Sequence, residues 1–209
     1  MTENPTETKP DDTQMPLGPG GRSAVPCSPS FVFDVESIGL HGEGYAVGFV
    51  VIDKDGTELD SGVLACPPEK ASGDDPDRKW VAENIPPIAS NHLNPNNVRV
   101  YFWEKWMEWK AKGALMFAEC AWPVEARFLI QCIEWDVNER RWHGPYPLHD
   151  VASVMLAAGM DPMANYDREP NELPKHDPLA DARQSARLLR EAFSRVGNIE
   201  SMPTASNQG

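Results

Sequence analysis

Two acidic residues interrupt an apolar run at FVFDVES (31–37), where Asp34 and Glu36 stand one residue apart. Alternate side chains of a strand share a face, so a strand here places both carboxylates on one side and the two phenylalanines on the other. Neighbouring carboxylates on a core strand repel each other and lose solvation, and a divalent cation offsets both costs. Carboxylate oxygens suit Mg²⁺ or Mn²⁺. The alternative is that Glu36 already lies in a loop and both groups are solvated.

A histidine and an aspartate lie five residues apart in HDPLAD (176–181). Asp177 followed by Pro178 is typical of a helix N-cap and a first helical position. Asp181 then falls in the first turn, where the positive helix end favours an anion. His176, just before this helix, is placed to act as a general base over the same site. Alternatively, His176 is an ordinary loop residue.

Two glutamates lie between these motifs, in ALMFAECAWPVEARFL (114–129). This segment predicts a short strand, a turn and the start of a helix. Glu119 falls at the strand end and Glu125 in the first helical turn, so either is a candidate for a third carboxylate. Each is alternatively a solvated or capping glutamate.

The elements that must position these residues follow from turn signals and apolar periodicity. Strands are predicted at 31–37, 44–53, 58–66 and 114–119, with a hairpin turn at 53–56 and a further strand end at 147–151. Helices are predicted at 75–84, 97–112, 123–135, 152–159 and 177–196. Three hairpin-connected strands followed by α/β units predict an α/β fold with a mixed sheet and helices packed on it. Asp150 is interpreted as the cap of the helix that follows it.

The composition and net charge of the chain limit the classes of protein to which it can belong. The chain has 209 residues, 41% hydrophobic and 24% charged, which is ordinary for a globular protein. The net charge of −13 argues against a protein that coats DNA non-specifically. No apolar run is long enough to span a membrane and no signal peptide is recognisable, so we expect a cytoplasmic protein without a membrane partner. The four cysteines are expected to be free thiols. Composition also predicts disordered tails at 1–28 and 198–209 around one domain at 29–197.

FDVE, then EARFL, then HDPLADA resembles the DEDDh group of 3′–5′ exonucleases, in particular its compact exoribonuclease-like branch from phages and bacteria. The resemblance spans about 30–195 and implies an RNase H-like mixed sheet of about five strands. Asp34 and Glu36 match the first motif, and His176 and Asp181 match the third. The second motif departs from the family pattern. When the sequence is aligned on the FL of EARFL, Glu125 falls at the position where the family usually has Asp. If positions are counted from the end of the predicted strand instead, Pro123 falls at the position of the family's Asp, and Glu119 is the acidic residue nearest to it. We favour Glu125.

The resemblance implies a chemistry and a set of roles. Two divalent ions, Mg²⁺ or Mn²⁺, would support hydrolysis that releases nucleoside 5′-monophosphates from the 3′ end of single-stranded RNA or DNA. The implied catalytic residues are His176, Asp34, Glu36, Asp181 and Glu125, and the implied metal ligands are the four acids among them together with Glu119. The expected substrate contacts are Val35, Ser37, Ile38, Trp80 and Trp122. RNA, DNA and short or cyclic oligonucleotides stay open as substrates, and a homodimer is possible in this family.

Two other functions compete. The dipeptides His149-Asp150 and His176-Asp177 are also found in HD-type metal phosphohydrolases, but that all-helical fold leaves the predicted strands unexplained. The glutamate in the second motif and the acidic charge suit a nuclease-like protein that binds a nucleotide or a partner protein without cutting. Six further residues are expected to be structural, three tryptophans in the core and three arginines on a solvated helix face: Trp103, Trp106, Trp109, Arg183, Arg187 and Arg190.

Overall fold

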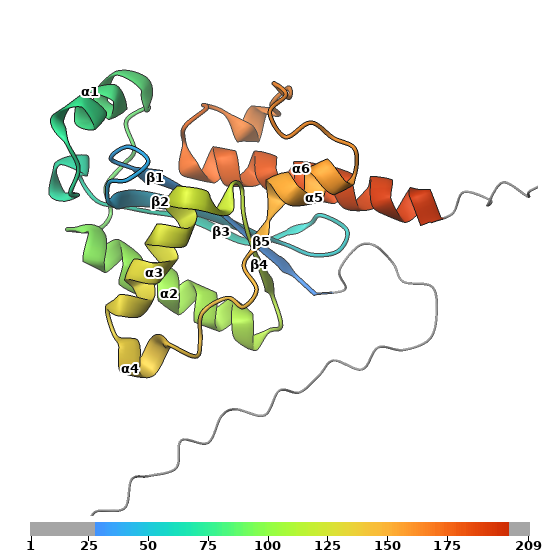
Figure 1. The fold of residues 1–209 in the computed structure, drawn as a ribbon, viewed down its shortest axis with the longest axis horizontal. Coiled ribbons are helices and arrows are strands. Elements are labelled where there is room, and N and C mark those ends of the chain that lie inside the picture. The colour runs from blue at the N-terminus through green and yellow to red at the C-terminus, as the bar shows by residue number, and fades with distance from the viewer. Residues whose placement is uncertain (1–27, 201–209) are drawn as a thin grey trace, which may run out of the picture.

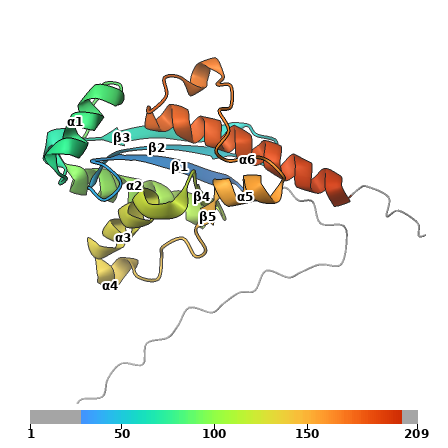
Figure 2. The same cartoon turned by 45° about the horizontal axis from the view of Figure 1, so that its top comes forward.

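The chain forms a five-stranded mixed sheet between two layers of helices, as a computed structural model that describes residues 28–200 shows (Figures 1 and 2). The strand order is β3-β2-β1-β4-β5. The strands are β1 (Ser30–Ser37), β2 (Gly44–Ile52), β3 (Glu58–Ala65), β4 (Leu115–Ala118) and β5 (His149–Asp150). The first three form an antiparallel meander, β4 pairs parallel to β1, and β5 pairs parallel to β4. The predicted α/β fold with a mixed sheet is confirmed.

Six helices and three short helical segments complete the described part of the chain. The helices are α1 (Asp75–Asn84), α2 (Pro95–Ala111), α3 (Ala126–Glu134), α4 (Val137–Arg140), α5 (Val151–Ala157) and α6 (Pro178–Glu200). The short segments are η1 (Pro68–Lys70), η2 (Ala121–Glu125) and η3 (Pro170–Glu172). The predicted caps hold, because Asp177 accepts hydrogen bonds from the backbone of Leu179 and Ala180, and Asp150 accepts one from Ser153.

The alternation of β1 divides the core between the two faces of the sheet. Phe31 and Phe33 lie in the cluster beneath α2 and α3, where Phe31 stacks on Phe49 with ring centroids 5.2 Å apart. Val32, on the other face, packs with residues of α5 and α6. Asp34 shares the face of Val32, as the strand periodicity predicted, and the structure shows that this is the face packed against α5 and α6. The three tryptophans of α2 are buried in the first cluster, which confirms their structural role: Trp103, Trp106 and Trp109.

Gly48 lets α6 begin directly on the sheet. It lies in β2 opposite Asp34, and a Cβ placed on it would lie 2.1 to 2.3 Å from backbone atoms of Pro178 and Leu179. Any larger residue would have to displace the helix backbone, since no flexible side chain is available to move aside. The glycine therefore sets the distance between the first turn of α6 and the acidic face of β1.

The helix predicted at 123–135 follows a kink. In η2, Trp122 is extended (φ −128°, ψ 137°), and it is the residue of this segment with non-helical dihedrals. Helical backbone resumes at Pro123 and continues through Glu125 into α3, so Pro123 occupies the first helical position after the kink, as the sequence predicted. The residue before a proline is sterically disfavoured in the α region, and this restriction at Trp122 accounts for the kink.

Several predictions fall at or beyond the limits of the described residues. α6 continues to Glu200, past the expected domain end at 197. Residues 1–27 and 201–209 lie outside the described part, so the predicted tails stay predictions. Cys66, Cys120 and Cys132 are free, as expected, whereas Cys27 lies outside. Among the helices described, none combines the length and the apolar composition needed to cross a membrane.

Candidate metal centre

Parallel strands β1 and β4 end at the same edge of the sheet and bring their acidic residues together. Phe33 pairs with Ala118 in the register of the two strands, so Asp34 and Glu119 are the next residue on each. The carboxyl groups of Asp34 and Glu119 lie within hydrogen-bonding reach of each other, and one of the two must carry the proton that is donated in such a bond. Asp34 is 8% exposed and Glu36, farther along β1, is 9% exposed. Glu36 thus lies within the strand, and the alternative of a solvated loop pair is wrong.

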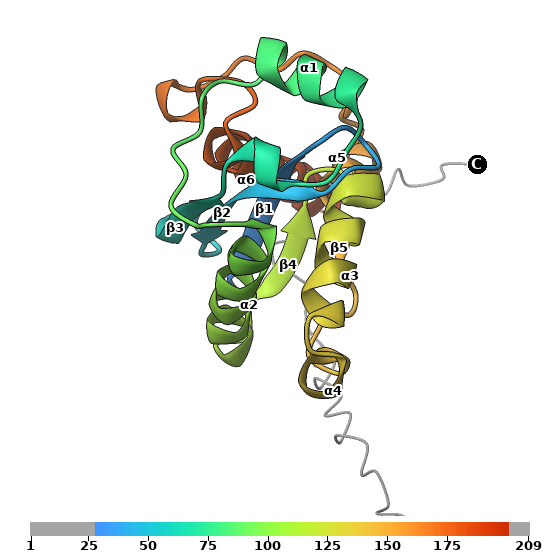
Figure 3. The ribbon, with the colours of Figure 1, turned by 90° about the vertical axis from the view of Figure 1, so that its left-hand side faces the viewer.

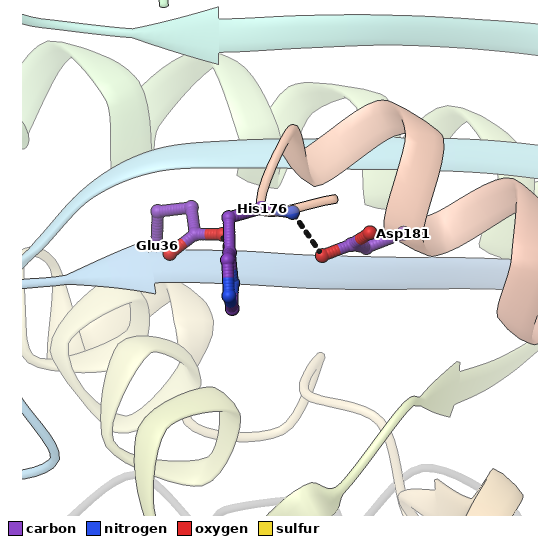
Figure 4. Close-up of side chains that lie close together, drawn as sticks. All are labelled: Glu36, His176 and Asp181. Atoms are coloured by element: carbon purple, nitrogen blue, oxygen red, sulfur yellow. Dashed lines mark hydrogen bonds and ion pairs between the residues drawn. The ribbon is translucent and has the colours of Figure 1, made fainter. Parts of the chain in front are cut away.

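The start of α6 adds the histidine and the second aspartate (Figure 4). One oxygen of Asp181, Oδ2, accepts a hydrogen bond of 3.0 Å from the backbone N–H of His176. His176 Nδ1 lies 3.8 Å from Glu36 Oε1. One potential ligand atom from each of Glu36, His176 and Asp181 lies within 4.8 Å of the others. The first and third sequence motifs therefore meet at one site.

Glu125 enters the same cluster from η2. Its side chain is 6% exposed and its carboxylate accepts a hydrogen bond from the backbone of Val35 on β1. It also lies close enough to Glu119 and Asp34 for the three carboxylates to interact. The structure thus brings both sequence candidates for the third acid to the site. Glu125 is buried and tied to the sheet, whereas Glu119 is half-buried and bonded to Asp34.

Burial and mutual repulsion make the ionised cluster costly. Burial, followed by the charges of Glu119 and Glu36, raises the pKa of Asp34 well above its usual range. Burial and then the charge of Asp181 raise the pKa of Glu36 to about 8. Burial is also the main cause that raises the pKa of Glu125 to about 8 and the pKa of Glu119 above its ordinary value. Such crowded carboxyls either retain protons or gain a cation.

The donor set fits a hard divalent cation. It consists of carboxylate oxygens from Asp34, Glu36, Glu119, Glu125 and Asp181, with one imidazole beside them. Oxygen ligands of this kind suit Mg²⁺ and Mn²⁺, and a bound cation relieves the repulsion that burial amplifies. Among the described residues, the ion pair made to these carboxylates by a basic side chain other than His176 comes from Arg168. The residues present therefore match the metal that the sequence motifs predicted.

His176 stands at the open side of the cluster. Its backbone is in the left-handed region (φ 64°), a conformation that few residues other than glycine adopt and one that often marks functional positions. Burial is the main cause that lowers the pKa of its imidazole, so the ring is mostly neutral at pH 7. Trp80 of α1 packs edge-on against it, with ring centroids 5.8 Å apart. Figure 3 shows α1 lying above the end of the sheet where β1 finishes.

The other expected substrate contacts are distributed unevenly. Trp80 is 48% exposed beside His176, and Trp122 is 75% exposed on η2. Ser37 is half-buried and donates its hydroxyl hydrogen to the Gly39 carbonyl at 2.7 Å. Val35 and Ile38 are buried in the hydrophobic core, which does not favour contact between their side chains and a substrate. As substrate-binding residues, all five stay predictions.

The arginines of α6 differ from the expected solvated face. Arg183 pairs with Glu58 of β3 at 2.8 Å, and Arg187 pairs with the buried Glu172 of η3 at 2.6 Å. Only Arg190 is fully exposed among the three. The correction arises because the β2–β3 hairpin and the segment before α6 fold back onto this helix, a packing that helix periodicity does not reveal.

The fold of this chain is similar to that of solved exonuclease structures. Exonuclease I from Methylocaldum szegediense superposes with a TM-score of 0.57 at 15% identity, over 83% of this chain and 42% of that one. Escherichia coli exonuclease I in complex with a dA16 oligonucleotide superposes with a TM-score of 0.54 at 13% identity, over 82% of this chain and 42% of that one. This chain has an exonuclease-like fold. It spans less than half the length of these two proteins, and no family model and no curated protein matches its sequence.

Arg168 contacts the cluster directly and was not among the site residues predicted from the sequence. Its guanidinium donates to Asp181 Oδ1 at 2.5 Å and to the Glu172 carbonyl at 2.8 Å. One signal was present in the sequence. Between the end of the last predicted strand and His176, the basic residues are Arg168 and Lys175, in a stretch rich in acidic residues and proline.

Proposed function

We propose that this protein is a metal-dependent 3′–5′ exonuclease of the DEDDh type that acts on single-stranded nucleic acid. One observation carries the proposal. Carboxylates from three segments far apart in the sequence converge with His176 on one edge of an exonuclease-like sheet, and their raised pKa values mark a site that a cation would stabilise. Perturbed acids gathered with a histidine are a typical signature of a catalytic site.

The five carboxylates are the proposed metal ligands. Asp34 stands among the other four and is the proposed residue shared between two ions, because all four raise its pKa. Glu36 and Asp181 lie on the side of His176. Glu119 directly follows β4 and Glu125 lies in η2. The chemistry supplied by two divalent ions in such a site is activation of water at neutral pH and neutralisation of charge on the leaving 3′-oxygen.

His176 is the proposed general base. Its lowered pKa keeps the imidazole free to accept a proton near pH 7. The backbone N–H of His176 bonds to Asp181, which holds the residue at the cluster. Its side chain lies beside Glu36 (Figure 4), with Nδ1 3.8 Å from Glu36 Oε1. The arrangement thus places a proton acceptor beside the acids that would bind the attacking water.

Trp80 is the proposed contact for the terminal base. It is exposed, lies beside His176 and belongs to a separate helix, α1, that borders the site. Aromatic side chains stack on bases of single strands without sequence preference. The solved structure of the Escherichia coli enzyme with dA16 shows that a protein of this fold binds a single strand. The proposed products are nucleoside 5′-monophosphates, from RNA or DNA, and a cytoplasmic location and a homodimer stay predictions.

A nuclease assay with two labels tests the proposal. Single-stranded RNA and DNA, each labelled at either the 5′ or the 3′ end, are incubated with the protein in Mg²⁺, Mn²⁺ or EDTA. We expect 5′-labelled strands to shorten stepwise and 3′-labelled strands to release a labelled mononucleotide at once, in metal only. A circular single strand should resist. Asp34→Ala is the inactive control.

Three results would contradict parts of the proposal. Early release of a 5′-labelled mononucleotide would reverse the polarity, and cutting of the circle would indicate an endonuclease. No hydrolysis in any metal, with tight binding of the strand, would favour the non-cutting protein suggested by the glutamate in the second motif.

A further inference from the structure

Arg168 bonds directly to a proposed metal ligand, Asp181. Its guanidinium is half-buried and bridges Asp181 Oδ1 and the carbonyl of Glu172. The other oxygen of Asp181, Oδ2, accepts the backbone N–H of His176. Both oxygens of this carboxylate are therefore engaged by donors from within the protein. A cation that binds through Oδ1 competes with the like-charged guanidinium of Arg168 for that oxygen.

The segment that carries Arg168 is firmly attached to α6. Arg187 pairs with Glu172 at 2.6 Å and also donates to the carbonyl of Asp167 at 2.8 Å. Gln184 donates to the carbonyl of Tyr166. The backbone on both sides of Arg168 is thus held in place, so exchange of its partner requires movement of the side chain alone.

The charge of Arg168 acts beyond its direct partner. Besides pairing with Asp181, it partly offsets the rise that burial causes in the pKa of Glu119, and it adds to the lowering of the pKa of His176. Five carboxylates share this arginine and the more distant, exposed Lys175 as basic side chains. One guanidinium offsets only part of that negative charge, so the cluster keeps a strong attraction for a divalent cation even where Arg168 is paired.

We infer that Arg168 is an exchangeable counter-ion: it competes with a divalent cation for Asp181, and once displaced it binds a phosphate oxygen of the substrate. The inference rests on the proposed function and names the residue that would recognise the substrate phosphate. Guanidinium groups bind phosphate with paired, charge-assisted hydrogen bonds, so the geometry that fits a carboxylate also fits a phosphodiester. The exchange keeps the buried guanidinium paired in both arrangements, which avoids the cost of an unpaired charge.

The test measures metal and nucleotide binding separately, without catalysis. Free Mn²⁺ is counted by electron paramagnetic resonance during titration of wild-type protein, Arg168→Gln, Arg168→Lys and Arg183→Gln. The last variant removes a different arginine–carboxylate pair of α6, Arg183–Glu58, and serves as the matched control. Binding of a nucleoside 5′-monophosphate is then measured by calorimetry at saturating Mn²⁺. Thermal melting verifies that each variant is folded.

Arg168→Gln should bind Mn²⁺ about fivefold more tightly than wild type, because a competing charge is gone. The same variant should bind the nucleotide about tenfold more weakly, because a charge-assisted contact is lost. Arg183→Gln should match wild type in both. Arg168→Lys keeps the charge but cannot bridge Asp181 and Glu172. Its affinities for Mn²⁺ and for the nucleotide should therefore lie between those of wild type and Arg168→Gln. If Arg168→Gln does not fold, this intermediate pattern in Arg168→Lys carries the test.

Weaker Mn²⁺ binding by Arg168→Gln would overturn the inference and make Arg168 a residue that merely orients Asp181. Unchanged nucleotide affinity would overturn the phosphate contact. Failure of all four proteins, wild type included, to bind Mn²⁺ would overturn the metal centre and the inference together. Wild-type binding with no gain in Arg168→Gln removes the inference alone, so the two failures are distinguishable.

Discussion

Gly48 of β2 pairs with Asp34 of β1, and the first turn of α6 sits directly on Gly48. The pair joins the two halves of the site, since Asp34 comes from the first motif and α6 carries the third. Glycine is needed because a Cβ would lie 2.1 Å from the backbone carbonyl carbon of Pro178, far inside van der Waals contact. The distance between the motifs is therefore set by a residue that performs no chemistry.

Replacing Gly48 by alanine should separate the motifs. We expect Gly48→Ala to lower stability by about 1–3 kcal/mol through overpacking and to reduce exonuclease activity more than about tenfold through displacement of His176 and Asp181. Denaturant unfolding and the end-label assay measure the two effects. Gly62→Ala on β3 is the control, because its Cβ would meet only the ring of Phe49, at 3.1 Å. Near-normal activity of Gly48→Ala would show that the approach of α6 is not critical.

Asp34→Asn should stabilise the metal-free protein while abolishing metal-dependent hydrolysis. The neutral amide removes a buried charge from a repelling cluster and can still hydrogen-bond to Glu119. Residues kept for function at the expense of stability behave in this way. In EDTA at pH 8 we expect a higher melting temperature than that of wild type, and in Mn²⁺ no further rise. A lower melting temperature in EDTA would mean that the carboxylate stabilises the fold.

Wild-type stability without metal should fall as pH rises from 6.5 to 8. The pKa of Glu36 and that of Glu125 are about 8 in the folded state against an ordinary 4.5, so the unfolded chain binds fewer protons than the native protein over this interval. Stability is then lost with rising pH, by at least about 1 kcal/mol. Below pH 6.5 the lowered pKa values of His92, His149 and His176 act in the opposite direction.

Urea unfolding in EDTA at several pH values measures this loss. The double variant Glu36→Gln with Glu125→Gln should flatten the slope, and Mn²⁺ should restore stability to wild type at pH 8. A slope that persists in the double variant would assign the effect to other groups.

Glu119 and Glu125 should both contribute to metal binding. Their carboxylates lie near Asp34 from two different segments, so we expect Glu119→Gln and Glu125→Gln each to weaken Mn²⁺ binding about tenfold or more. Glu83→Gln, an exposed change on α1, is the control. Titration of Mn²⁺ without substrate gives the result. If one variant binds as wild type does, that glutamate is structural and the other fills the third acidic position.

Trp80→Ala should weaken substrate binding and leave the fold intact. The side chain is half exposed, so its loss costs little stability, whereas a lost base stack is worth about 1–3 kcal/mol. We expect KM for an oligonucleotide to rise about tenfold with kcat changed less, and Trp80→Phe to recover most of the loss. Trp135→Ala, at the far end of α3, is the control. An unchanged KM would remove Trp80 from the substrate site and leave Trp122 as the aromatic candidate.

The sequence by itself determined the local features of the site. The alternation of FVFDVES placed Asp34 and Glu36 on one face of β1 because strand geometry has a fixed period. Asp177 and Pro178 located the start of α6, since capping depends on adjacent residues. The order of the strands and of five helices likewise followed from local periodicity, as did the mixed sheet, whereas the short helix α4 was not predicted.

Only the tertiary structure decided how these segments meet. The sequence left a choice between Glu119 and Glu125 for the third acid. In the structure both reach the site, because β4 and η2 both end beside β1. Arg168 pairs with Asp181 across thirteen residues of irregular chain, and Gly48 matters only because α6 lands on it. Contacts of this kind depend on distances through space that no sequence period encodes. Local propensity fixes which way a side chain points, and packing fixes what it meets.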